Sequence, residues 1–199
     1  MRKITINLAA VAAFCIVVAS PALVSSSCAT PQTEQEDTTI IREDLGITAL
    51  KYSSPEVPSS IEFCGKVIDL SRFDRHERMD RELLAFTYMH STSLQMLKKA
   101  NRYFPIVEPI LKENGIPDDF KYLMVIESNM NPTARSSAGA AGLWQFMQGT
   151  GRDYGLEVNN NVDERYHIEK ATRAACRYLK DAYAKYKDWV AVAASYNAD

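Results

Sequence analysis

The most restrictive feature of this chain is the spacing of its apolar residues, which follows a helical period from Glu77 onward. Apolar residues recur three and four positions apart, as on one face of an amphipathic helix. No alternating apolar and polar run of strand length occurs in 76–199. The sequence therefore predicts an all-α fold whose core lies in the second half of the chain.

Prolines and capping residues divide this region into several expected helices. The first is expected to run from Glu77 to about Tyr103, because Pro105 follows and disfavours a continuous helix. A second is expected to stop at Asn114-Gly115, a typical C-terminal cap. The segments after the first helix are 105–113, 117–127, 141–154, 168–186 and 188–197. Residues 128–142 are expected to form a loop, since they are rich in Asn, Ser, Ala and Gly.

The N-terminal segment 1–27 has the pattern of a secretory signal peptide. Its start, Met1-Arg2-Lys3, is basic, and the stretch 8–19 is apolar without interruption. That stretch is shorter than the roughly 20 residues that a membrane-spanning helix requires. The sequence therefore predicts export, and an uncleaved N-terminal anchor is the alternative.

A cysteine at the end of this segment is a candidate lipidation site. Ser25-Ser26-Ser27-Cys28 resembles a bacterial lipoprotein cleavage site, although Ser25 stands where leucine is usual. Lipid on Cys28 would anchor the protein to a membrane. Cleavage after Ala22 or Ala29 by the ordinary signal peptidase is the alternative.

The segment 28–75 is expected to be a poorly ordered linker. Residues 29–60 are rich in Thr, Ser, Pro, Glu and Gln, and they can bury little apolar surface to offset chain entropy. A short extended piece at 67–70 is the exception. The folded domain is therefore expected to span 76–199.

Charge and cysteine usage argue against two classes of binding site. The chain has 23 basic and 25 acidic residues, and loss of 1–27 removes two of the basic ones, so a nucleic-acid partner is disfavoured. No C-x-x-C motif or Cys/His cluster occurs, so neither a metal nor another cofactor is predicted. The sequence leaves open whether Cys64 and Cys176 pair.

One acidic residue interrupts an otherwise apolar helix face. Phe120, Leu123, Met124 and Glu127 are spaced so that they share that face. A carboxyl group buried there would keep its proton to an unusually high pH, as a general acid requires near neutrality. Spacing alone also allows the alternative that Glu127 ends the helix and faces solvent.

Two motifs resemble the lysozyme-like lytic transglycosylases (the SLT family) of bacterial cell-wall metabolism. The first consists of Glu127-Ser128, then Ser136, then the run Gly139-Ala140-Ala141-Gly142-Leu143-Trp144-Gln145-Phe146-Met147. The second is Ser195-Tyr196-Asn197-Ala198. They occur in the family's order, and the resemblance covers roughly 105–199.

The resemblance implies a lysozyme-like helical domain of the goose type and a set of site residues. Glu127 aligns with the family's single catalytic acid. The positions that line the family's sugar-binding groove are Ser136, Gln145, Met147, Tyr196 and Asn197. Met147 and Trp144 are equally compatible with a place in the core. Three acids downstream match no family role and are expected to be solvated: Asp153, Asp163 and Glu164.

The implied activity is cleavage of the β-1,4 bond between N-acetylmuramic acid and N-acetylglucosamine, leaving a 1,6-anhydromuramoyl end and requiring no cofactor. Peptidoglycan would be the partner, and the protein would lie in the bacterial periplasm, soluble or lipid-anchored. A muramidase-type hydrolase is one alternative. A non-catalytic cell-wall-binding protein is another, because the family has glycine where Asp199 stands and further helices after it. The domain is thus expected to lack its C-terminal part. The sequence leaves its oligomeric state open.

Overall fold

The computed structural model describes residues 55–196 of the chain. The predictions for the signal peptide, for Cys28 and for Asn197 concern residues outside this range. No helix within 55–196 is both long enough and apolar enough to cross a lipid bilayer.

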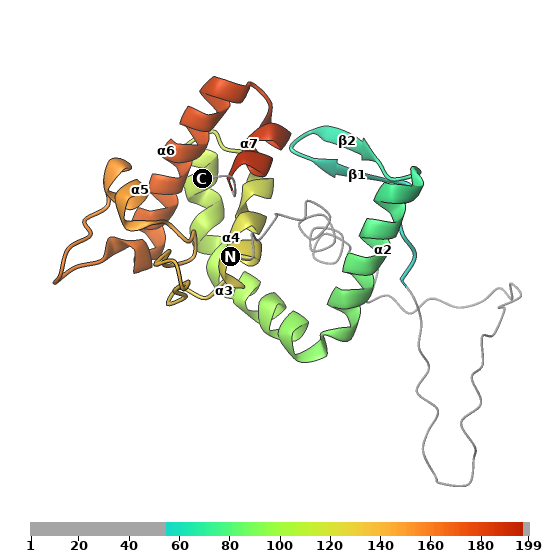
Figure 1. Ribbon diagram of the computed structural model, residues 1–199, viewed down its shortest axis with the longest axis horizontal. Coiled ribbons are helices and arrows are strands. Elements are labelled where there is room, and N and C mark those ends of the chain that lie inside the picture. Colours follow the sequence, from blue (N-terminus) through green and yellow to red (C-terminus); the bar gives the residue numbers. More distant parts are fainter. Residues whose placement is uncertain (1–54, 197–199) are drawn as a thin grey trace, which may run out of the picture.

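The described part is mostly helical, which confirms the predicted all-α class, and it adds one small antiparallel sheet (Figure 1). Its elements are β1 (Ser60–Phe63), β2 (Lys66–Asp69), α2 (Phe73–Tyr88), α3 (His90–Glu113), the 3-10 turn η3 (Asp118–Tyr122), α4 (Leu123–Ser128), α5 (Gln148–Asp153), the 3-10 turn η4 (Glu164–Tyr166), α6 (Ile168–Tyr186) and α7 (Trp189–Ser195).

The first predicted helix boundary is wrong, because the chain breaks at Met89 and not before Pro105. Helices α2 and α3 meet at Met89 at an angle, as Figure 1 shows, and α3 then continues to Glu113. Pro105 and Pro109 both lie on the exposed side of α3. A proline there deprives the carbonyl four residues earlier of its helical partner, but water can replace that partner on an exposed face.

The end of the predicted linker is folded as a hairpin. Strands β1 and β2 pair in register, with Ile61 opposite Ile68. Cys64 and Gly65 form the two-residue turn, and both have the positive φ that a type I′ turn requires. The expectation of a poorly ordered segment therefore does not hold for 55–75.

Tertiary contacts explain why composition alone did not reveal this hairpin. Phe63 is buried and its ring lies 6.1 Å from that of Phe120. The backbone N–H of Cys64 donates a 2.6 Å hydrogen bond to the Asp119 carboxylate, so Asp119 holds the hairpin and does not cap its own helical turn. The hairpin is thus fixed to the segment that leads into α4.

The main core lies between α3, α6 and the η3–α4 segment. Its most deeply buried side chains include Val107, Leu111, Phe120, Leu123, Met124, Trp144, Cys176 and Leu179. Burial raises the pKa of the free Cys176 thiol to about 11, so it is protonated at neutral pH. A second, smaller cluster of Leu70, Met79 and Leu83 joins the hairpin to α2.

Helix α6 has the bounds that its apolar spacing predicts, 168–186, whereas the expected helix at 141–154 is mostly wrong. Residues 142–145 form a turn that a bridge between Ala141 and Phe146 closes, and only 148–153 are helical. Gly142 and Gln145 have φ values of 79° and 49°, in the left-handed region that a right-handed helix excludes. The motif run 139–147 is therefore a structured loop, which we call the motif loop.

Candidate functional site

Glu127 lies in the last turn of α4, a short helix whose other side chains are mostly buried. The helix ends one residue later, at Ser128, whose hydroxyl donates to the Met124 carbonyl at 2.9 Å. Asn129 then adopts a left-handed conformation, and Lys99 of α3 donates to its carbonyl at 3.0 Å. Glu127 is thus presented from the core at a well-defined helix end.

The Glu127 side chain is half-buried, and this changes its acidity. Removal of the carboxylate from water raises its pKa from 4.5 to about 7. Such burial does not fit the alternative in which Glu127 faces bulk solvent. Near neutral pH this group can therefore both give up and take back a proton.

Tyr196, at the end of α7, lies close enough to Glu127 for the carboxylate charge to affect the tyrosine hydroxyl. Burial raises the pKa of the Tyr196 hydroxyl well above its usual value, and the negative charge of Glu127 adds to this effect. The hydroxyl donates a 2.9 Å hydrogen bond to the Trp144 carbonyl. The structure thus brings together residues from both sequence motifs.

Trp144 belongs to the core and not to an open groove. Its side chain is fully buried, and its indole N–H donates to the Thr172 hydroxyl of α6 at 3.0 Å. That hydroxyl in turn donates to the Ile168 carbonyl at 2.7 Å. Trp144 therefore fixes the motif loop to α6, while its own carbonyl holds Tyr196.

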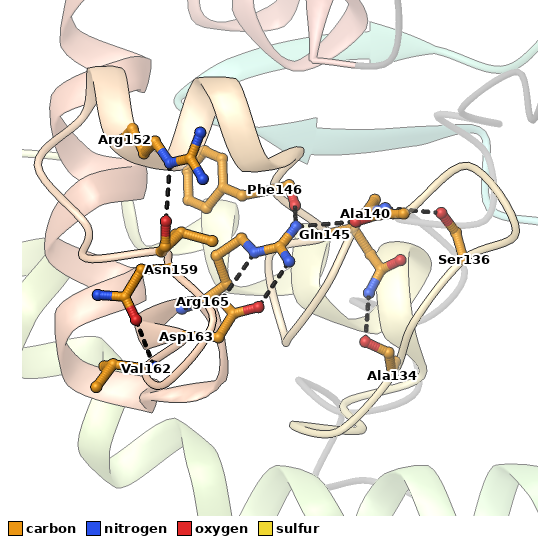
Figure 2. A network of polar contacts seen from close by, with 12 residues as sticks. Ala134, Ser136, Ala140, Gln145, Phe146, Arg152, Asn159, Val162, Asp163 and Arg165 are labelled. Atoms are coloured by element: carbon orange, nitrogen blue, oxygen red, sulfur yellow. Dashed lines mark hydrogen bonds and ion pairs between the residues drawn. The ribbon is translucent and has the colours of Figure 1, made fainter.

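Gln145 and Ser136 are half-buried and form hydrogen bonds within the loop that carries them (Figure 2). The Gln145 amide nitrogen donates to the Gly142 carbonyl at 2.8 Å and to the Ala134 carbonyl at 3.3 Å. The Ser136 hydroxyl accepts from the Ala140 N–H at 3.0 Å. These bonds fix the conformation of both side chains.

A buried arginine lies behind this loop. Arg165, in η4, is only 2% exposed. Its guanidinium forms a two-point ion pair with Asp163 and also donates to the carbonyls of Gly139 and Phe146 (Figure 2). The motif loop therefore rests on a fully buried and fully paired charge.

A family comparison agrees with this arrangement. The family model described as Transglycosylase SLT domain matches residues 105–199. Residues 105–199, just under half of the chain, are thus similar to the transglycosylase SLT domain.

Similar curated proteins include membrane-bound lytic murein transglycosylase D of Escherichia coli strain K12. It is 31% identical over 123 residues, which are 61% of this chain and 26% of that protein. A putative tributyltin chloride resistance protein of Alteromonas sp. strain M-1 is 22% identical over 111 residues, which are 55% of this chain and 54% of that protein. The chain thus spans about a quarter of the first relative and about half of the second.

Of the predicted site residues that the structure describes, Tyr196 is the one that the charge of Glu127 is found to affect. Gln145 follows Trp144 in the chain, and the Trp144 carbonyl accepts the hydrogen bond from Tyr196. Met147 is 44% exposed where α5 begins, so it lies outside the core. The sugar-binding roles themselves stay predictions.

The expectation that the downstream acids are solvated is wrong for two of three. Asp163 is paired with Arg165, whose hydrogen bond lowers the pKa of that carboxyl. Glu164 is paired with Lys170, and only Asp153 is exposed. Sequence reasoning missed Arg165 because two of its partners, the carbonyls of Gly139 and Phe146, are backbone groups in a distant loop. Among residues 55–196, no three His, Cys, Asp or Glu side chains group as metal ligands would.

Proposed function

We propose that this chain is a peptidoglycan lytic transglycosylase that uses Glu127 as its single catalytic acid and base. The observation that carries the proposal is the half-buried Glu127 carboxyl, whose pKa is raised to about 7. The SLT family match and the similarity to a lytic murein transglycosylase support the same activity.

One carboxyl group suffices if the substrate supplies the second function. Protonated Glu127 donates its proton to the oxygen between N-acetylmuramic acid and N-acetylglucosamine, and the bond from that oxygen to the anomeric carbon breaks. The 2-acetamido group stabilises the positive charge on that carbon. The C6 hydroxyl of the same sugar then attacks the carbon and returns its proton to Glu127. The product is a 1,6-anhydro end, formed without water.

Residues of the two sequence motifs are proposed to bind the glycan. Both donors of the Gln145 amide face the loop, so its carbonyl oxygen is the atom that would accept a hydrogen bond from a sugar. The other proposed contacts are Ser136, Met147, Tyr196 and Asn197. We also propose that residues 1–27 direct export to the cell envelope and that Cys28 carries a lipid anchor.

The product distinguishes this reaction from that of a muramidase. Purified peptidoglycan digested with the protein is expected to yield muropeptides that are lighter by one water than the hydrolysis products. Mass spectrometry of the soluble fraction measures this difference directly. Muropeptides with ordinary reducing ends would instead support the muramidase alternative.

The pH profile is expected to reflect the titration of Glu127. Because the acid must carry its proton when the bond breaks, kcat/KM, which reports the titration of the free enzyme, should be highest below pH 7. Above pH 7 it should fall about tenfold for each further pH unit. The check is kcat/KM measured between pH 5 and 9, with Asp153→Asn as a control whose profile should be unchanged. A rate that is constant across this range would exclude Glu127 as the proton donor.

A further inference from the structure

We infer that Arg165 is a positioning residue for glycan binding, holding the loop 134–147 in the shape that presents Ser136 and Gln145. This inference rests on the proposed function, because it concerns how that function's sugar-binding side chains are placed. Arg165 itself is buried and does not face the site.

The first part of the argument is the set of hydrogen bonds that the guanidinium makes. Nε and Nη2 donate to the two carboxylate oxygens of Asp163 at 2.9 and 2.6 Å. Nη1 donates to the Gly139 carbonyl at 2.8 Å and to the Phe146 carbonyl at 2.9 Å. One group therefore binds two points of the loop that lie seven residues apart in the sequence.

The Gly139 carbonyl lies within the turn that shapes Ser136. The Gly139 N–H donates to the Ser136 carbonyl at 3.0 Å, and the Ser136 N–H donates to the Ala140 carbonyl at 2.9 Å. The Ala140 N–H returns a bond to the Ser136 hydroxyl at 3.0 Å. Arg165 thus binds the tight turn in which the Ser136 side chain is fixed.

A second route leads from Arg165 to Gln145. The backbone of Gly142 packs so closely on that of Arg165 that a Cβ atom on Gly142 would lie 1.9 Å from the Arg165 carbonyl oxygen. The Gly142 carbonyl is the acceptor for the Gln145 amide, and the Phe146 carbonyl next in the chain binds Nη1. Gln145 is therefore held between two backbone groups that contact Arg165.

The chemistry of the site requires arginine in particular. A buried charge is costly unless it is paired and all its donors are satisfied. Only the planar guanidinium can bind a carboxylate at two points and still reach two carbonyls, whereas a lysine ammonium is a single point. Loss of this geometry should free the loop while leaving α6, which is anchored by its own core contacts, in place.

The test compares Arg165→Lys with Arg152→Lys, a matched control in which an exposed arginine donates to the Val158 carbonyl. The N-acetylglucosamine tetrasaccharide serves as the probe, and its Kd is measured by calorimetry. Loss of two buried hydrogen bonds should weaken binding about tenfold in Arg165→Lys. Amide hydrogen exchange should quicken at 134–147 and stay unchanged in α6. The fall of kcat/KM near pH 7 should not move, because Glu127 keeps its surroundings.

Every other outcome either refutes the role of Arg165 or shows that the proposed function fails independently of that role. Unchanged loop exchange or unchanged Kd would refute the role of Arg165, and faster exchange throughout the domain would show a global structural role instead. Asp163→Asn, which keeps the shape but removes the charge, should give the same loop-specific pattern with a smaller effect, even where Arg165→Lys fails to fold. If the wild-type protein neither binds nor cleaves glycan, the proposed function fails, while the exchange comparison still decides whether Arg165 holds the loop.

Discussion

Replacing Glu127 by glutamine is expected to reduce the release of muropeptides from peptidoglycan about a thousandfold, the usual scale for removal of a general acid. Glutamine has nearly the same shape as glutamic acid but cannot donate the proton that the leaving oxygen needs. The check is the steady-state rate at pH 6, where wild-type Glu127 is mostly protonated. Asp153→Asn removes an exposed carboxyl from the same domain and should retain full activity.

Stability measurements show whether the inactive variant is folded. The folded-state pKa of Glu127, about 7, lies above the value of 4.5 for the exposed group. The stability that the proton contributes is therefore complete below pH 4.5 and is lost as pH rises through 7. At pH 8 the wild-type protein has up to about 3 kcal/mol less stability from this group than at low pH. Glu127→Gln should thus be more stable than wild type at pH 8 and equal to it at pH 4.

Equal muropeptide release by wild type and Glu127→Gln would contradict the proposed mechanism. If both proteins also bound glycan, the chain would act as a non-catalytic cell-wall-binding protein. A variant that is inactive but less stable at pH 8 would show instead that Glu127 is paired as a carboxylate. These outcomes distinguish an enzyme from a binding protein, because muropeptide release, glycan binding and stability are all measured on the same variant.

The elements that the sequence predicts well are those governed by local spacing. Helix α6 has regular apolar spacing and no internal proline or glycine, and its observed bounds agree with the prediction. The face that carries Glu127 follows the same rule in α4, where the buried Leu123 and Met124 lie at helical spacing from it, although Phe120 belongs to the preceding 3-10 turn. Local spacing therefore favours burial of this carboxyl, and the resemblance to the family motif implies that the buried group is the catalytic acid.

The elements that the sequence predicts poorly depend on contacts between distant segments. The run 141–147 has helix-forming residues, but Gly142 packs against the Arg165 backbone and holds the chain in a left-handed conformation. The hairpin is similar, since Phe63 finds its partner Phe120 only in the folded core. Pro105 misled the prediction for the opposite reason, because its effect on α3 depends on which side faces water. For the loop and the hairpin the deciding partner is a distant residue, and for Pro105 it is the solvent exposure that the tertiary fold determines.

The Gly142 contact leads to the second large expected effect. Gly142→Ala should destabilise the domain by about 3 to 5 kcal/mol, since it combines backbone strain with a steric clash. Its φ is 79°, and the new Cβ would lie 1.9 Å from the Arg165 carbonyl oxygen, which cannot move without displacing η4. Chemical denaturation followed by circular dichroism measures the loss.

Two other glycines of the same segment separate strain from clash. Gly139→Ala meets a φ of 93° but open space, so it should cost only about 1 kcal/mol. Gly149→Ala, in α5 with ordinary φ and open space, should be neutral or stabilise by up to about 1 kcal/mol. Equal losses for Gly142→Ala and Gly139→Ala would show that strain alone matters and that the loop does not pack on Arg165. A much larger loss of unfolding free energy at Gly142 would instead mean that close packing on the Arg165 backbone requires glycine at this position. Because Gln145 donates to the Gly142 carbonyl, the same packing would also place Gln145.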